Sequence, residues 1–231
     1  MTLDWLFPPR CLSCRALIRR NPDFFCASCE ARWPVLKPPY CSRCARPFES
    51  SEETSHLCGE CLVSERSCAQ VHATALYEGV LLNLIQRLKY HREERLAHFL
   101  GQRMGRDFCS RENDFDLIVP APLYRDRLRE RGYNQALLLA REVGCHLKKP
   151  VEAFVLSRAR AAPPQTTLKG DERRKNLKGA FLVRCPKKVE EKRILLVDDV
   201  YTTGTTVEEA SRTLLKAGAA RVEALVLARA H

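Results

Sequence analysis

The sequence predicts an α/β fold in which an open, mostly parallel sheet is flanked by helices and preceded by a small cysteine-rich module. Two segments, the mostly apolar Phe115–Pro120 with Asp116 near its start and the unbroken apolar run Ile194–Val197, are typical of parallel strands that are covered on both faces. The pattern of an amphipathic helix follows each run, which is the order of elements in an α/β sheet. Four CxxC pairs within the first 61 residues set the amino-terminal module apart.

The amino-terminal module has the cysteine spacing of a zinc-binding protein. Its four pairs are Cys11/Cys14, Cys26/Cys29, Cys41/Cys44 and Cys58/Cys61. A CxxC turn places two thiolates on one side of a knuckle, and two knuckles complete a tetrahedral zinc site. Disulfides are the alternative, but a chain without an export signal is expected in the reducing cytosol. We expect structural zinc in one or two ions, and we prefer two closed sites. The spacings do not decide whether each knuckle shares its ion with the next knuckle in sequence or whether the pairing is crossed.

The four remaining cysteines are isolated in the sequence. They are Cys68, Cys109, Cys145 and Cys185. A lone cysteine behaves as a small hydrophobic residue more often than as a ligand. We therefore interpret all four as packed thiols.

Apolar residues at helical spacing predict two helices between residues 80 and 108, with a break near Tyr90–Glu94. Lys89 and Tyr90 lie at that break. We interpret them as a solvated helix end with a packed aromatic ring, in preference to a functional pair.

A basic segment follows the strand predicted at Phe115–Pro120. It contains Arg125, Arg127, Arg129 and Arg131 and continues as Gly132-Tyr133-Asn134-Gln135. Asn134 suits the cap of the next helix. If the two predicted strands are neighbours, these arginines lie at the same sheet edge as the end of Ile194–Val197, where they could hold a pyrophosphate; a solvated basic helix start is the alternative.

Residues 157–181 form a long polar and basic stretch that contains Pro163 and Pro164. Long irregular segments in compact domains are often lids over a site. A disordered linker is the alternative.

Two adjacent acids, Asp198 and Asp199, end the strand at Ile194–Val197, and the turn Tyr201–Thr206 leads from them into a helix that ends at Gly218. Open α/β sheets bind ligands beyond the carboxyl ends of their strands. A phosphate at this turn would meet free backbone N–H groups, threonine hydroxyls and the helix dipole, the last contributing roughly 0.3–2 kcal/mol. The segment therefore predicts a site for a phosphorylated sugar.

The stretch RILLVDDVYTTGTT resembles the binding loop for phosphoribosyl diphosphate (PRPP) in type I phosphoribosyltransferases. The resemblance implies that Asp198 and Asp199 hold the ribose hydroxyls. It implies that the 5-phosphate and its surroundings are bound by Tyr201, Thr202, Thr203, Gly204, Thr205 and Thr206. Purine-salvage members of that family carry Asp where this chain has Thr202, so a purine-salvage enzyme is disfavoured.

The chain also resembles the ComF family of competence-associated, phosphoribosyltransferase-like proteins. Three features carry this resemblance: the segment RERGYNQA, the spaced pattern R-A-R, Q-T-T-L, E-R-R-K-N and G-A-F, and the amino-terminal double zinc ribbon that the four CxxC pairs would form. The likeness covers nearly the whole chain in the same order. It implies a pyrophosphate-side signature at Arg131, Asn134 and Gln135. It also implies a flexible lid that carries Arg158, Arg160, Gln165, Leu168, Arg173 and Asn176. Ala162 departs from the Thr that family members often have, which leaves the fine contacts of the lid open.

Length and composition fit one α/β core with a smaller module, which we place at residues 67–231 and 1–66. Residues 1–70 contain nine basic and eight acidic residues, whereas residues 71–231 contain 30 and 20. An anionic small molecule or a nucleic acid would be attracted to the second part. No stretch approaches the ~20 apolar residues of a membrane span, and the apolar amino terminus is too short for a secretory signal, so we expect a cytoplasmic protein.

These observations and resemblances lead to two hypotheses about function. In the first, the protein is an enzyme that transfers the phosphoribosyl group of magnesium-bound PRPP to an unidentified acceptor, with Asp198, Asp199 and Arg131 in the catalytic site. In the second, the protein senses PRPP and binds single-stranded DNA, with Trp5, Trp33 and Tyr40 as candidates for base stacking. The family resemblance links either role to DNA uptake and natural competence, with DNA-uptake or recombination proteins as further candidate partners. A zinc adaptor with an inactive transferase part is a third alternative. The acceptor and the oligomeric state are not predictable from the sequence.

Overall fold

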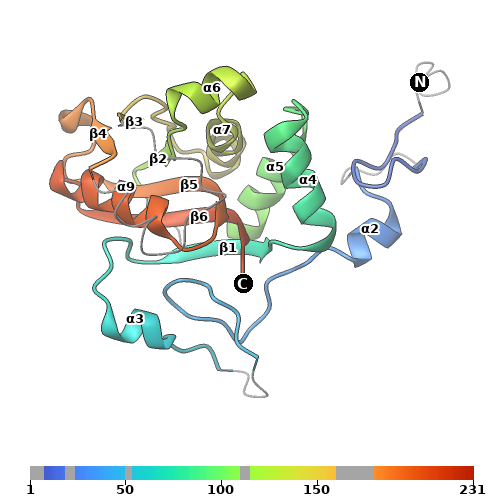
Figure 1. Cartoon of the computed structure of the whole chain (residues 1–231), viewed down its shortest axis with the longest axis horizontal. Coiled ribbons are helices and arrows are strands. Elements are labelled where there is room, and N and C mark those ends of the chain that lie inside the picture. Colours follow the sequence, from blue (N-terminus) through green and yellow to red (C-terminus); the bar gives the residue numbers. More distant parts are fainter. Residues whose placement is uncertain (1–7, 19–23, 50–53, 110–114, 160–178) are drawn as a thin grey trace.

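The computed structural model of the protein describes residues 8–18, 24–49, 54–109, 115–159 and 179–231 (Figure 1). A four-stranded parallel sheet lies at its centre in the order β1-β6-β5-β2. Its strands are β1 (Val71–Leu76), β2 (Leu117–Pro120), β5 (Arg193–Tyr201) and β6 (Arg221–Arg229). The two predicted strands are neighbours in the sheet, because Leu117 to Pro120 pair with Ile194 to Val197.

Strand β5 is longer than its apolar run. It continues through the two acids to Tyr201, which pairs with Arg229 of β6. The acids are thus part of the strand, and their strand partners come from β6 alone, since β2 ends opposite Val197.

Helices cover both faces of the sheet, as the unbroken apolar strands predict. The longer helices are α4 (Gly79–Tyr90), α5 (Leu96–Cys109), α6 (Arg125–Arg131), α7 (Gln135–Leu147) and α9 (Thr205–Lys216). Buried residues of α4, α5 and α7 share one core cluster with Leu195 and Val197 of β5. Buried residues of α9 share the other cluster with Ile194 and Leu196, because alternate side chains of a strand point to opposite faces.

The smaller elements lie around this core. They are α2 (Ala27–Ala31), α3 (Gly59–Val63), the 3-10 turn η1 (Pro186–Lys188) and the antiparallel pair β3 (Leu156–Arg158) and β4 (Phe181–Val183). The pair β3–β4 frames the long polar segment, whose residues 160–178 lie outside the described part of the chain.

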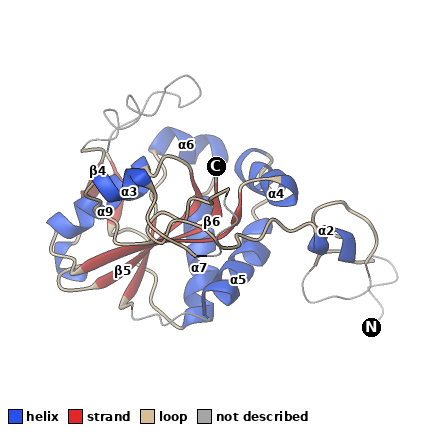
Figure 2. Cartoon of the chain, turned by 90° about the horizontal axis from the view of Figure 1, so that it is seen from below, coloured by secondary structure: helices blue, strands red, loops and turns tan. Residues whose placement is uncertain are grey.

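The two cysteine-rich ribbons join the two different core clusters, which lie on opposite faces of the sheet. The first, which contains α2, joins the core of α4 and α5, and Figure 2 shows it at the end of the molecule near these helices. The second, which contains α3, joins the core of α9. The chain between the ribbons follows the outer edge of β1: the carbonyl oxygen of Pro34 accepts a hydrogen bond from the backbone N–H of Leu76, and that of Arg43 accepts one from Val71.

Two sequence interpretations need correction here. Cys145 and Cys185 are exposed, so they are not packed thiols, whereas Cys68 is buried as expected. The side chain of Cys109 is outside the description.

Among the helices that are described, none combines the length and the apolar character that a membrane crossing requires.

Candidate functional site

The eight CxxC cysteines form two groups, and the pairing of the knuckles is sequential. Cys11, Cys14, Cys26 and Cys29 form the first group, and Cys41, Cys44, Cys58 and Cys61 form the second, with all sulfur atoms of a group within 4.8 Å of one another. One sulfur pair in each group is separated by 3.6 or 3.7 Å. A tetrahedral zinc ion with ~2.3 Å bonds to sulfur requires about 3.8 Å between ligands. Both groups therefore fit zinc, and four sulfur ligands leave no open position for catalysis.

The second group is the more deeply buried of the two. All four of its cysteines are buried, whereas Cys14 of the first group is exposed. The sulfur of Cys41 accepts backbone N–H groups from Cys58 at 3.3 Å and from Cys44 at 3.5 Å. Burial acts to raise the pKa of the Cys41 thiol, but these N–H groups outweigh it and lower the pKa to about 6. Such N–H groups favour the thiolate, the form that binds metal.

The acidic pair lies directly beyond the end of β2. Because that strand ends at Pro120, opposite Val197, Asp198 and Asp199 border the crevice where open α/β sheets bind ligands. Oδ1 of Asp198 accepts the backbone N–H of Asp199 at 2.8 Å, and Oδ1 of Asp199 accepts that of Val200 at 2.7 Å. Both carboxylates are thus oriented by the backbone through one oxygen. Burial first, and the negative charge of Asp199 second, raise the pKa of Asp198 to about 7.

Lys89 reaches the acidic pair from the last turn of α4. Its Nζ lies 2.8 Å from Oδ2 of Asp199, and the side chains are 18% and 5% exposed. Burial acts to lower the pKa of Lys89, but the attraction of Asp199 outweighs it and the pKa is raised. The two helices are broken as predicted, but the interpretation of their junction was wrong: Lys89 is paired rather than solvated, and Tyr90 is 66% exposed rather than packed.

The turn after β5 leads directly into the amino terminus of α9. Gly204 has φ +77°, a conformation that favours glycine, and α9 begins at the next residue. The hydroxyls of Thr203 and Thr205 lie 2.9 Å apart. The first N–H groups of α9 and these hydroxyls are available on the same short segment, as the sequence predicts.

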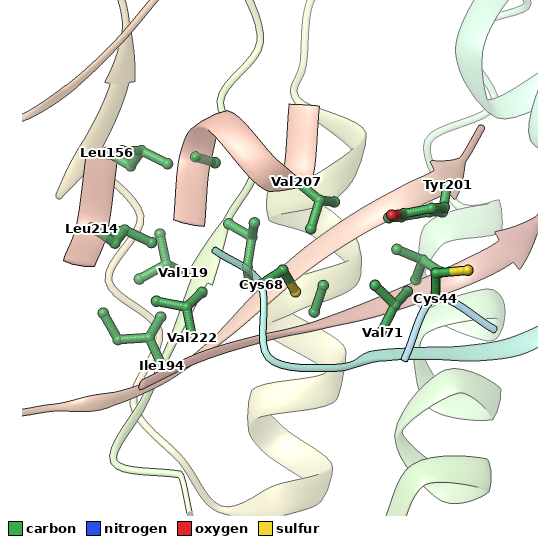
Figure 3. Close-up of a cluster of buried hydrophobic side chains, with 14 of the residues drawn as sticks. Cys44, Cys68, Val71, Val119, Leu156, Ile194, Tyr201, Val207, Leu214 and Val222 are labelled. Atoms are coloured by element: carbon green, nitrogen blue, oxygen red, sulfur yellow. The ribbon is translucent and has the colours of Figure 1, made fainter. Parts of the chain in front are cut away.

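The side chain of Tyr201 packs against Gly204 on the core side of this turn. Its side chain is 2% exposed, and a Cβ at position 204 would collide with its hydroxyl, so the ring fills the space under Gly204. Figure 3 shows Tyr201 near Cys44, in the core cluster that the second ribbon shares with α9. A ligand can reach Tyr201 only through its backbone.

Two arginines connect the turn to the second ribbon. Arg229, 2% exposed at the end of β6, donates from Nε to the carbonyl oxygen of Cys44 at 3.1 Å and from Nη1 to that of Thr202 at 3.1 Å. Arg66 donates to the hydroxyl of Tyr201 at 3.2 Å and pairs with Glu60, which lies between Cys58 and Cys61, at 3.1 Å. The loop and the second ribbon are therefore connected through these two side chains.

The residues predicted for the pyrophosphate side follow β2. The side chain of Asn134 caps α7 by accepting the N–H of Ala136 at 3.0 Å, as predicted, and its amide donates to the carbonyl oxygen of Ala121 at 3.0 Å. Arg131 donates to the side chain of Gln135, and its guanidinium lies 5.7 Å from the ring centre of Tyr90. Arg131 is thus next to Tyr90 and the end of α4.

Among the predicted lid residues, only Arg158 falls within the described part of the chain. It lies at the end of β3, where burial acts to lower its pKa and the charge of Asp198 opposes this effect. Arg158 is consequently close enough to Asp198 to interact electrostatically. The others, Arg160, Gln165, Leu168, Arg173 and Asn176, lie outside the described residues, as does Trp5. Trp33 is buried against Phe25 and Arg103, so it belongs to the core of the first ribbon.

Sequence reasoning missed three residues of this site: Lys89, Arg66 and Arg229. Arg229 did have a signal, because a basic residue inside the run Val222–Ala230 must find acceptors if that run is a buried strand. Lys89 and Arg66 have no comparable signal, since a basic residue at a helix end or in a loop is ordinary.

Comparison with known proteins gives a consistent result. Residues 2–62 match the double zinc ribbon domain, and residues 132–231 match the phosphoribosyl transferase domain. Competence protein F of Haemophilus influenzae is 33% identical over 228 residues, which cover 96% of this chain and 97% of the relative. DNA utilization protein YhgH of Escherichia coli K12 is 31% identical with the same coverage. Competence protein ComFC of Bacillus subtilis is 28% identical over 93% of this chain and 88% of its own.

Proposed function

The chain belongs to the ComF family, and on that premise we propose that it binds PRPP with magnesium and transfers the phosphoribosyl group to an acceptor. The observation that carries the proposal is the meeting of opposite charges at one sheet edge. The acidic pair of β5 lies beside the start of α9, and basic side chains reach the same edge from α4 and β3. PRPP has a diol that suits carboxylates, and a 5-phosphate and a pyrophosphate that suit cations and helix amino termini.

The residues have distinct roles in this proposal. The N–H groups of α9 and the hydroxyls of Thr203 and Thr205 bind the 5-phosphate. Asp198 and Asp199 bind the ribose hydroxyls and orient the ring. Arg131 and Arg158 balance the negative charge that grows on the leaving pyrophosphate. The remaining proposed contacts are Tyr201 through its backbone, Thr202, Gly204, Thr206, Asn134 and Gln135.

The acidic pair also fits magnesium, because each carboxylate is oriented through Oδ1 and directs Oδ2 to other partners. Magnesium binds few carboxylates and otherwise keeps water or phosphate oxygens, and it would supply further neutralisation of the phosphates. The proposal therefore needs no dedicated metal cage.

Calorimetric titration of magnesium and PRPP into the wild type and into Asp199→Asn tests the proposal, with pyrophosphate release followed in the same samples. We expect wild-type binding that is lost in D199N, because the ribose hydroxyls lose an ionised acceptor. Asp126→Asn is the matched control, since Asp126 is an exposed acid in α6 at the same edge. Absence of wild-type binding would refute the proposal.

A second candidate function is the PRPP-gated binding of single-stranded DNA. It is favoured by the exposed ring of Tyr90 beside Arg131 at the site, since aromatic and guanidinium groups stack on bases. The relatives named for competence and DNA utilization add to its plausibility. Anisotropy of a labelled oligonucleotide, with and without PRPP and over a range of salt, tests it. Salt-sensitive binding that PRPP changes, without pyrophosphate release, would favour this function over transfer.

The proposal assigns residues 1–66 to the zinc-ribbon module and residues 67–231 to the phosphoribosyltransferase-like part. The double zinc ribbon match ends at residue 62, close to the proposed boundary, and the phosphoribosyl transferase match covers residues 132–231. Cytoplasmic location remains part of the proposal as well, and two groups of four cysteines that fit zinc agree with it.

A further inference from the structure

The end of α4 is fixed from both sides, which determines where Lys89 points. The hydroxyl of Tyr133 donates to the carbonyl oxygen of Leu88. On the other side, Arg87 pairs with Glu93 at 2.6 Å and donates to the carbonyl oxygen of Leu12 in the first ribbon. Residues immediately before Lys89 are therefore held by the segment that follows β2 and by the first zinc ribbon.

A need for stability does not explain a lysine in this position. Burying an ion pair costs solvation that its attraction only partly returns, so such pairs add little stability compared with apolar residues. The pair here is 18% and 5% exposed and lies at the ligand edge of the sheet, not in its core. Its clearest effect is chemical: the ammonium occupies Oδ2 of Asp199, the oxygen that the backbone leaves for other partners.

We infer that Lys89 is a substrate-binding residue that neutralises Asp199 until PRPP arrives with its metal ion, and then turns to the phosphates of PRPP. The inference rests on the proposed function. An ammonium suits this exchange, because a lysine head group on a flexible stem can move between two anionic partners a few ångströms apart.

This arrangement has two consequences that a purely structural ion pair would not have. A divalent cation without PRPP must compete with Lys89 for Asp199, so it should bind poorly to the wild type. Removal of Lys89 should therefore improve the binding of the cation alone, and at the same time weaken the binding of PRPP, which loses a charge-assisted contact. Opposite changes for the two ligands distinguish a role in binding from a role in folding.

The experiment compares Lys89→Met, Lys89→Gln and Lys89→Arg with the wild type. Binding of Mn²⁺ alone is measured by electron paramagnetic resonance, and binding of PRPP with magnesium by calorimetry. Lys188→Met is the matched control, because Lys188 also pairs with a carboxylate at 2.8 Å, that of Glu152, but lies on the surface. We expect K89M and K89Q to bind Mn²⁺ more tightly than the wild type does, and to bind PRPP with an affinity that is lower by about tenfold or more. K89R should retain most of the PRPP affinity, and K188M should match the wild type.

The outcomes separate the inference from the proposed function. If the wild type binds PRPP and K89M and K89Q bind it equally well, the role of Lys89 is refuted and the proposed function stands. If K89M and K89Q lose PRPP affinity without gaining Mn²⁺ affinity, the exchange is refuted. If the wild type binds no PRPP, the proposed function fails and this inference fails with it. Should K89M not fold, K89Q and K89R give the same comparison.

Discussion

Arg229 donates a hydrogen bond to the carbonyl oxygen of Cys44, which joins the last strand of the sheet to a zinc knuckle 185 residues earlier in the chain. The same guanidinium donates to the carbonyl oxygens of Tyr201 and Thr202. One buried side chain therefore holds the proposed phosphate loop against the second ribbon.

Arg229→Met should lower the free energy of unfolding by about 2–4 kcal/mol, because several buried carbonyl oxygens lose their donor. PRPP affinity should fall as well, since Thr202 is no longer held. Denaturant unfolding and calorimetry measure the two effects. Arg221→Met is the control in the same strand: its side chain is 55% exposed and pairs with Glu223, so a change below about 1 kcal/mol is expected. Equal effects of R229M and R221M would contradict the connection.

Loss of zinc from the two groups should have different consequences for PRPP binding. Cys44→Ser and Cys14→Ser should each lose one zinc ion per chain in metal analysis. C44S should lose more of its PRPP affinity than C14S, because the second ribbon contains Cys44 and Glu60, the partners of Arg229 and Arg66. If C14S impairs PRPP binding as strongly as C44S, the second ribbon has no special connection to the loop.

Gly204→Ala should be more damaging than Gly132→Ala. Both glycines have positive φ, +77° and +90°, so both substitutions carry a backbone strain of about 1–2 kcal/mol. A Cβ at position 132 meets open space, whereas one at position 204 collides with Tyr201. The difference between the two variants in thermal stability and PRPP affinity thus isolates the contact under the loop. Similar losses in both variants would mean that Tyr201 moves away without consequence.

Asp198→Asn should change how stability depends on pH. The pKa of Asp198 is raised to about 7, above its ordinary value near 3.8. The folded state therefore binds the proton more tightly than the unfolded state, and this group lowers the stability of the wild type as pH rises toward 7. D198N lacks the effect, so its stability relative to the wild type should increase by about 2 kcal/mol between pH 5 and pH 8. Denaturant unfolding across this range checks the sign, and parallel pH profiles for the two proteins would contradict it.

The sequence predicts the parts of this protein that depend on local pattern. The buried strands, the cap at Asn134 and the turn at Gly204 follow from apolar runs and small residues with known backbone preferences, and all three are present. The CxxC spacing likewise predicts two metal groups. The pairing of the knuckles is not local, because it depends on how the chain returns to itself.

The unpredicted part of the site consists of long charged side chains. Lys89 is 110 residues from Asp199 in sequence, and Arg66 is 135 residues from Tyr201. A lysine at a helix end gives the same local pattern whether it is solvated or paired. Only the packing of α4 against the sheet edge decides between these states, and that packing is a property of the tertiary structure.

The backbone bonds that residues 34 and 43 make along β1 have a consequence for the cell rather than for catalysis. They cover the free edge of the sheet, and exposed edges are sites where chains add to one another and aggregate. Both residues belong to the cysteine-rich segment, which metal holds in shape. A cell that is short of zinc should therefore contain less of this protein in its soluble fraction, so that metal supply determines the amount of protein in addition to the ligand affinity of each molecule. Immunoblots of soluble and pelleted fractions from zinc-limited cells would reveal this directly.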